Sequence, residues 1–151
     1  MNRTAWTPHV LLPALALLTG AAAQGPVAVE DAWIPQSPPG MEMMAGYATF
    51  HNRGTGPVTI TGAASPAFGR VEFHRTVHEG GMARMKHLPR LRIEAGSRVR
   101  LEPGGLHLML MAPRRRLAPG DEVEITFTTA GGRRVQARFT VRPRNGARHR
   151  H

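Results

Sequence analysis

Residues 106–111 read Leu106-His107-Leu108-Met109-Leu110-Met111, so that leucine alternates with histidine or methionine. Successive side chains of a β-strand point to opposite faces, which puts the leucines on one face and His107, Met109 and Met111 on the other. With the leucines in a core, the second face carries thioethers where an antiparallel sheet normally carries polar groups. Two explanations for these thioethers are equally good: a metal ion binds to this face, or a second layer or a partner covers the face.

The same period-2 alternation continues through the rest of the chain, and no stretch has helical periodicity. Runs rich in glycine and proline separate the alternating segments. The predicted strands are residues 27–33, 46–51, 57–63, 68–77, 82–86, 91–93, 98–101, 106–111, 122–128 and 135–141. Many short strands at near-regular spacing predict an all-β sandwich.

Two of these strands carry specific expectations about which side chains share a face. In the first, Val27, Val29, Asp31 and Trp33 are predicted to lie on one side. In residues 68–77 the apolar side is Val71, Phe73 and Val77, so that His74 points to the opposite side together with Glu72 and Thr76. The turn at 52–56 separates the predicted strands 46–51 and 57–63, and Gly80-Gly81 returns the chain into 82–86.

The ends of the chain predict export. Arg3 precedes a short apolar run at 10–18, and Ala21-Ala22-Ala23 supplies the small residues of a cleavage site, so we expect residues 1–23 to be a signal peptide. The apolar run is too short to span a bilayer. We therefore expect a periplasmic protein with no membrane insertion after cleavage, a single domain at residues 24–141, and a basic disordered tail at 142–151.

Composition excludes several classes of site. The sequence contains no cysteine, which removes disulfides, thiolate zinc and iron–sulfur sites, thiol nucleophiles, blue-copper centres and a lipid-anchoring cysteine. The carboxylates are scattered, and neither a Ser/His/Asp order nor a phosphate-binding glycine loop is present. We therefore do not expect an enzyme.

The charge is strongly positive, with 20 Lys and Arg against 10 Asp and Glu. The basic residues are spread along the chain, and aromatic residues make up only 5% of it, so stacking platforms for nucleic acid are scarce. We expect a solvated basic surface and no nucleic-acid partner. An envelope adaptor that binds acidic partners through its arginines, with the methionine face as a protein interface, remains an alternative.

Four histidines and methionines are spaced as His74-x10-Met85-x21-His107-x-Met109. This spacing resembles the H-x10-M-x21-H-x-M signature of the PCuAC family of periplasmic copper chaperones. Further similarities are Trp33, Tyr47, Asn52 and the segments 103–109 and 117–121, so the resemblance covers most of residues 27–141. Arg75 stands where many members of the family have methionine after the first histidine, which leaves a fifth ligand there in question.

The resemblance implies a single-domain, cupredoxin-like Greek-key β-sandwich that binds one Cu(I) through His74, Met85, His107 and Met109. Two imidazoles and two thioethers are soft, neutral donors, and this donor set by itself favours Cu(I) over zinc, calcium or magnesium. The family further implies a monomer that delivers copper to the copper centre of cytochrome c oxidase, with the oxidase copper subunit or a thioredoxin-like assembly factor as partner. Copper buffering for resistance, without a dedicated client, is the alternative use of the same site.

Other histidines and methionines have weaker support. We expect His78 and His87 to be solvated surface residues, with transient copper binding as the alternative. His51 is expected on a strand surface. Met41, Met43, Met44 and Met82 are expected to be filler rather than a flexible entry patch. Additional ligation by Met111, or by His149 and His151 in the tail, is left open.

Overall fold

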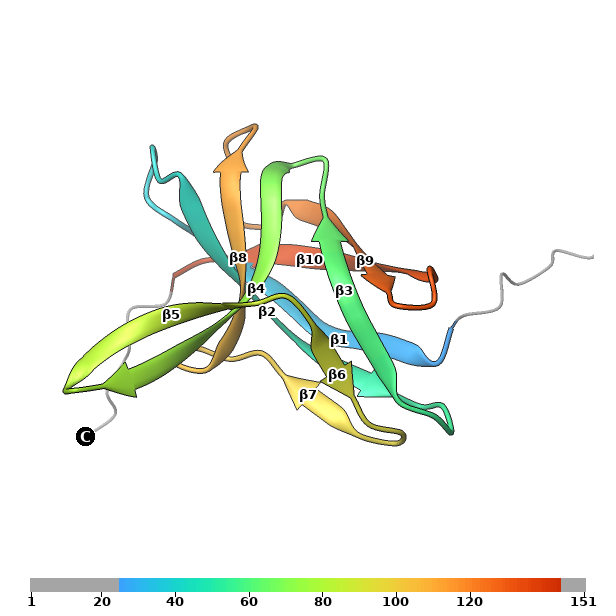
Figure 1. Ribbon diagram of the computed structural model, residues 1–151. Coiled ribbons are helices and arrows are strands. Elements are labelled where there is room, and N and C mark those ends of the chain that lie inside the picture. The colour runs from blue at the N-terminus through green and yellow to red at the C-terminus, as the bar shows by residue number, and fades with distance from the viewer. Residues whose placement is uncertain (1–24, 145–151) are drawn as a thin grey trace, which may run out of the picture.

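The computed structural model describes residues 25–144, and all regular elements in that range are β-strands (Figure 1). They are β1 (Val27–Pro35), β2 (Met43–Asn52), β3 (Val58–Ala64), β4 (Phe68–Glu79), β5 (Met82–Leu88), β6 (Leu91–Ile93), β7 (Arg98–Arg100), β8 (Leu106–Pro113), β9 (Glu122–Thr129) and β10 (Arg134–Arg142). The predicted all-β class is confirmed. The predicted signal peptide at 1–23 and residues 145–151 of the predicted tail lie outside the described residues. Within residues 25–144, no helix is long and apolar enough to cross a membrane.

Seven strands close into a barrel in the order β4, β8, β2, β1, β10, β9 and β3. The closing contact is the pairing of Ala63 on β3 with Val71 on β4. Neighbouring strands are antiparallel except for β1 and β10, which run parallel. The short strand β7 continues the edge of β2 beyond β8, and β6 pairs with the remaining edge of β3.

The inward side chains of the alternating strands form one apolar core. Its centre is aromatic: the ring centroid of Phe50 lies 5.0 Å from that of Phe127 and 5.9 Å from that of Phe73, both in edge-to-face orientation. Phe139 continues the cluster from β10. Aromatic pairs with this geometry add to the free energy gained by apolar burial, so strands from opposite sides of the barrel are joined through the core.

The prediction that Val27, Val29, Asp31 and Trp33 share one face is wrong beyond Val29. Asp31 has φ 50°, and the pairing of β1 with β2 shifts register between Glu30 and Trp33. A β-bulge of this kind inserts one residue and exchanges the two faces of the strand after it. Ile34 therefore points into the core, and Trp33 lies on the outside against Tyr47.

The strands on either side of the turn at 52–56 do not pair with each other. β2 pairs with β1, β7 and β8, whereas β3 pairs with β4, β6 and β9, so the turn carries the chain across the barrel. Asn52 holds this turn. Its fully buried side-chain amide donates to the carbonyls of Gly56 (2.8 Å) and Ile93 (3.0 Å) and accepts from the N–H of Gly54 (3.0 Å).

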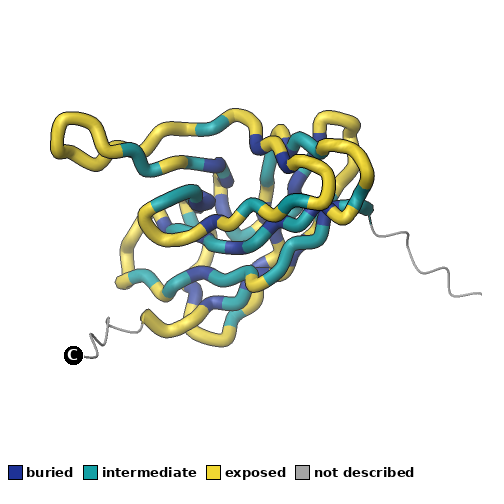
Figure 2. The backbone as a smooth tube through the Cα atoms, turned by 90° about the horizontal axis from the view of Figure 1, so that it is seen from below, coloured by how far each residue is buried: buried dark blue, intermediate teal, exposed yellow. Residues whose placement is uncertain are grey.

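The hairpin of β4 and β5 extends beyond the barrel. The first half of β4, from Phe68 to Arg75, pairs with β8, while its second half pairs only with β5. Figure 1 shows the hairpin projecting at the left, and Figure 2 shows the same part of the chain mostly in the colour of exposed residues. Methionines on this hairpin are therefore displayed to solvent.

Replacing Asn52 by Asp tests the buried turn. We expect the free energy of unfolding at pH 7 to fall by at least about 2 kcal/mol, because two carbonyls lose their donor and face a carboxylate. Burial raises the pKa of an aspartate placed there in the folded state, so the loss is present above that pKa and shrinks as the pH falls through it. Urea unfolding at pH 7 and pH 4 measures this. The Asn52→Ala variant, which cannot titrate, is expected to lose the same free energy at both values, and equal pH dependence in the two variants would contradict the assignment.

Candidate metal centre

Three histidines form a row across the outer face of the sheet. His74 on β4 is directly opposite His107 on β8, and on its other side it is directly opposite His87 on β5. The ring centroid of His74 lies 6.1 Å from that of His107 and 5.5 Å from that of His87. Leu108 and Leu110 are fully buried on the inner face, so the predicted division of residues 106–111 between the two faces is confirmed.

Met109 and Met85 flank this row on opposite sides. Met109 follows His107 by two residues on the same face, a spacing of about 6.5–7 Å along a strand. Met85 precedes His87 by two residues on β5 and is paired with Thr76, which makes it a diagonal neighbour of His74 at about 7–8 Å. His74 is therefore the central residue of the four predicted ligands, one step from each of the other three.

One ring nitrogen of each facing imidazole is fixed by a hydrogen bond. Nε2 of His74 lies 2.9 Å from Oε2 of Glu72, and Nδ1 of His107 lies 3.1 Å from the carbonyl oxygen of Gly105. Carboxylates and carbonyls only accept, so these two nitrogens carry the protons of the neutral rings. The Gly105 carbonyl also accepts from the N–H of Thr76 at 3.1 Å, which holds it in place against β4.

The second ring nitrogen of each imidazole has no partner. Nδ1 of His74 and Nε2 of His107 are buried and form no hydrogen bond with any group of residues 25–144. In the neutral tautomers assigned above, both atoms present a lone pair. An unsatisfied buried polar atom costs about 1–3 kcal/mol, and two such atoms on facing side chains form a pair of preformed ligand positions for a cation.

Glu72 is a functional residue that the sequence analysis did not single out. The hydrogen bond from His74 lowers the pKa of the Glu72 carboxyl below its usual value against the opposing effect of burial, and His87 and Arg70 lower it further. The carboxylate therefore stays ionised and orients His74. Its position two residues before His74 on the same face is visible in the sequence. The Gly105 carbonyl, a main-chain atom, leaves no side-chain signal there.

The donor set fits a soft, singly charged ion better than a hard divalent one. Imidazole and thioether donors carry no charge, and thioethers select soft ions. Within residues 25–144, no three side chains among histidine, aspartate and glutamate are grouped to hold a metal ion. Two imidazole nitrogens without a hydrogen-bond partner, on directly opposed residues and with thioethers nearby, are what this surface offers to a ligand.

The other candidates lie in different places. His78 is exposed near the tip of the hairpin, paired with Ala83, whereas the exposed His87 lies beside His74 because of the register of the hairpin. His51 is half-buried on β2, with its Nδ1 3.3 Å from Nε of Arg53. Met44 belongs to the core, while Met41, Met43 and Met82 are exposed. His149 and His151 lie outside the described residues.

The chain is similar to several known proteins. The family model described as "Putative lipoprotein LpqE-like" matches residues 27–141. The "Putative lipoprotein Lxx21020" of Leifsonia xyli subsp. xyli is 34% identical over 139 residues, which cover 91% of this chain and 82% of that protein.

Solved structures with the same fold include two that hold copper by their descriptions. The solution structure of CuI-DR1885 from Deinococcus radiodurans is 34% identical, covers 88% of this chain and 89% of that one, and superposes with a TM-score of 0.66. The copper-bound PCuAC domain from PmoF2 is 22% identical, covers 80% and 96%, and also has a TM-score of 0.66. The predicted cupredoxin-like β fold is confirmed by these likenesses.

The hydrogen bonds predict that the two neutral histidines have different tautomers. We expect the Nε2–H form for His74 and the Nδ1–H form for His107, because Glu72 and Gly105 accept from those atoms. Long-range ¹H–¹⁵N correlation spectra at about pH 8.5, two units above the ordinary imidazole pKa, distinguish the forms. The exposed His78 serves as the control and should show averaged tautomers. A single shared tautomer for His74 and His107, or a His74 signal unchanged by Glu72→Ala, would contradict the assignment.

Proposed function

The chain belongs to the LpqE-like family, and from this membership and the geometry of the histidine row we propose that it is a copper chaperone. The resemblance to the PCuAC family is confirmed. In this proposal the protein binds one Cu(I) through His74, Met85, His107 and Met109 and passes it to an acceptor protein. The activity is capture and transfer of an ion, with copper as cargo rather than as a catalytic cofactor.

The single observation that carries the proposal is the pair of unpartnered, buried nitrogens on facing strands. A protein that had no use for His74 Nδ1 and His107 Nε2 would lose stability by keeping both atoms without a hydrogen bond. A bound ion would use both lone pairs at once. The hydrogen bonds to Glu72 and Gly105 act on the other nitrogen of each ring, which fixes the tautomer and raises the basicity of the ligand atom.

The thioethers support Cu(I) as the cargo. Two neutral imidazoles and two neutral thioethers leave the single charge of Cu(I) uncompensated at low cost and bind a divalent ion poorly. Thioethers also need no deprotonation and form no disulfides, so disulfide formation cannot remove these ligands in an oxidising compartment, although oxidation to sulfoxides would damage the site. The copper-bound and Cu(I)-bound relatives are consistent with this cargo.

The exposure of the ligands supports release without unfolding. His107 is buried within the barrel wall, whereas Met85 is 60% exposed on β5, which among the strands of residues 25–144 pairs only with β4. An acceptor can therefore replace Met85 first while the imidazoles still hold the ion. Met109 and the two histidines would follow one at a time, so that each step exchanges one ligand for another.

The location and the client extend the proposal. We place the protein in the periplasm because of the predicted signal peptide, and both the family and the Leifsonia relative carry the description "putative lipoprotein". The client we propose is the copper centre of cytochrome c oxidase, reached directly or through a thioredoxin-like assembly factor.

Copper binding is tested by anaerobic titration of residues 24–151 with Cu(I) against a chromophoric chelator. We expect one tight equivalent, and a loss of affinity of about 100-fold in His107→Ala, equivalent to about 2.7 kcal/mol. The control is His78→Ala, which removes an exposed histidine from the same sheet and should leave the affinity unchanged. Failure of the wild-type protein to compete with the chelator would overturn the chaperone proposal and favour the basic-surface adaptor.

The role of the thioethers is tested on a matched pair of methionines. Met85 and Met82 lie on the same strand and are each 60% exposed, but they are an odd number of residues apart and so face opposite sides. We expect Met85→Ala to weaken Cu(I) binding about tenfold and Met82→Ala to have no effect. Equal affinities of the two variants would remove Met85 from the ligand set.

Transfer separates a chaperone from a copper buffer. We expect the wild-type protein to deliver Cu(I) to the purified copper domain of an oxidase faster than free diffusion of the released ion allows, and Met109→Ala to transfer at a different rate. The two proteins are loaded equally and the acceptor is followed by its absorbance. Equal transfer by wild type and Met109→Ala would refute the stepwise exchange, and rates independent of acceptor concentration would indicate buffering.

A further inference from the structure

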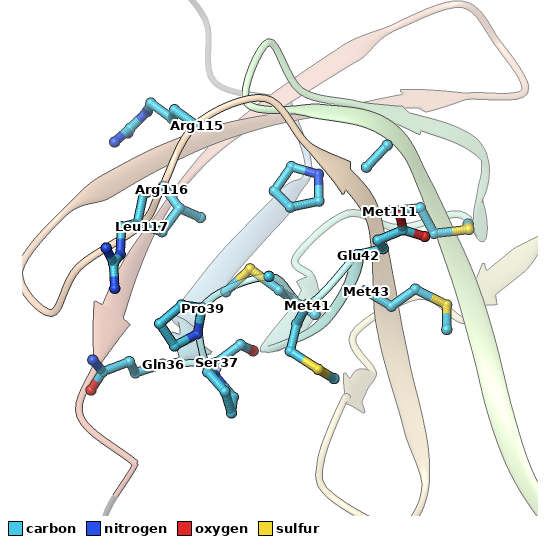
Figure 3. A pocket seen from close by; sticks show the side chains of 15 residues that line it. Gln36, Ser37, Pro39, Met41, Glu42, Met43, Met111, Arg115, Arg116 and Leu117 are labelled. Atoms are coloured by element: carbon cyan, nitrogen blue, oxygen red, sulfur yellow. The ribbon is translucent and has the colours of Figure 1, made fainter.

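The row of thioethers does not end at Met109. Met111 follows it by two residues on β8, on the same outer face, and is paired directly with Met43 on β2. Side chains of directly opposed residues have Cβ atoms about 4.5–5.5 Å apart. Figure 3 shows the Met43 and Met111 side chains extending in the same direction from neighbouring strands, with Met41 beside them.

These methionines have no packing role that explains them. Met43 is 54% exposed and Met41 is 50% exposed, in contrast to Met44, whose side chain points to the opposite face of β2 and is buried in the core. Methionine as an adaptable core filler accounts for Met44. It does not account for two flexible apolar side chains held in solvent next to a third.

The three methionines line one side of a cavity of about 890 Å³. The loop before β2 supplies Met41, and the loop after β8 supplies the opposite wall with Arg115, Arg116 and Leu117 (Figure 3). The N–H of Ala112, whose φ is 52°, donates to the carbonyl of Glu42 at 2.9 Å and joins the two loops at the base of the methionines. The cavity-lining residue Met111 lies two residues along β8 from the predicted copper ligand Met109.

We propose that Met41, Met43 and Met111 form a second, weaker site for Cu(I), built from thioethers alone, through which the ion reaches the His74–His107 site. Three neutral sulfur donors select a soft monovalent ion and reject hard divalent ones. The existence of this thioether site does not depend on the proposed function. Its role as an entrance for copper does rest on the proposed function.

The charges around the cavity make this site one of passage. Arg70 lies on β4 directly opposite Met111, and Arg115 and Arg116 line the far wall. Arg70 and Arg115 are partly neutralised by Glu72 (3.5 Å) and Asp121 (3.2 Å). The lining residue Glu42 balances the remaining Arg116, so these charges add no net attraction for a cation. The lining also contains no histidine, and an ion bound here therefore gains free energy by moving to the imidazoles.

The path to the tight site is short. Met109 lies between the two sites on β8, about 6.5–7 Å along the strand from Met111 on one side and from His107 on the other. A thioether released from one ion position can therefore bind the ion in the next. Capture at Met43 and Met111 is followed by Met109 and then by the two imidazoles.

The test uses Ag(I), a redox-stable analogue of Cu(I), and ¹³C-methyl methionine labelling of the whole protein. We expect two equivalents to bind, the first shifting the methyl signals of Met85 and Met109 and the second those of Met43 and Met111. The double variant Met43→Leu/Met111→Leu should lose the second equivalent and keep the first. Leucine conserves the volume of methionine, and Met82→Leu is the matched control that should keep both.

Two further measurements separate this proposal from the copper chaperone proposal. In His107→Ala, loss of the first equivalent with Met43 and Met111 still shifting supports both proposals. A first equivalent that survives His107→Ala, while Met43 and Met111 still shift, would overturn the chaperone site alone. If the wild-type protein binds only one equivalent of Ag(I), the thioether site alone is overturned. The same holds if a second equivalent binds but leaves the Met43 and Met111 methyl signals unmoved. With Cu(I) at limiting concentration, we expect the double variant to load the tight site about tenfold more slowly.

Discussion

The antiparallel register between β4 and β8 is the constraint on which the site depends. It places His74 directly opposite His107, and a slip of one residue would turn every side chain of one strand to the other face. The barrel prevents such a slip. β8 is held between β4 and β2, while β4 is tied to β3 at the closure and packs its Phe73 against Phe50 and Phe127 in the core.

The barrel wall and the hydrogen bonds together prepare the two imidazoles for an ion. The wall buries the rings, and Glu72 and Gly105 each take up one nitrogen, so that the remaining nitrogens have a fixed direction and no partner. In the proposed function, binding of the ion returns the free energy lost by leaving these nitrogens unpaired. Stability and binding therefore oppose each other at this pair of residues, as is usual at functional sites.

Exposure divides the proposed ligands into a fixed half and an accessible half. The histidines belong to the barrel, whereas Met85 lies on the projecting hairpin and Met43 and Met41 lie at the rim of the cavity. Thioethers are flexible and neutral, so they can exchange an ion without a change in protonation. A carrier needs both halves, because retention requires preformed ligands and transfer requires ligands that a partner can reach.

Period-2 alternation is a local property of the chain, so the strands, the faces of β4 and β8, and the spacing of four soft donors along one surface could be predicted from the order of residues alone. The sequence did not reveal the bulge at Asp31, which moved Ile34 rather than Trp33 into the core, or the adjacency of His87 to His74. It also did not identify Glu72 and Gly105 as the groups that orient the rings. Those features depend on which strands become neighbours and in which register. They became visible in the folded protein, because barrel closure and cross-strand hydrogen bonds join residues that are far apart in the chain.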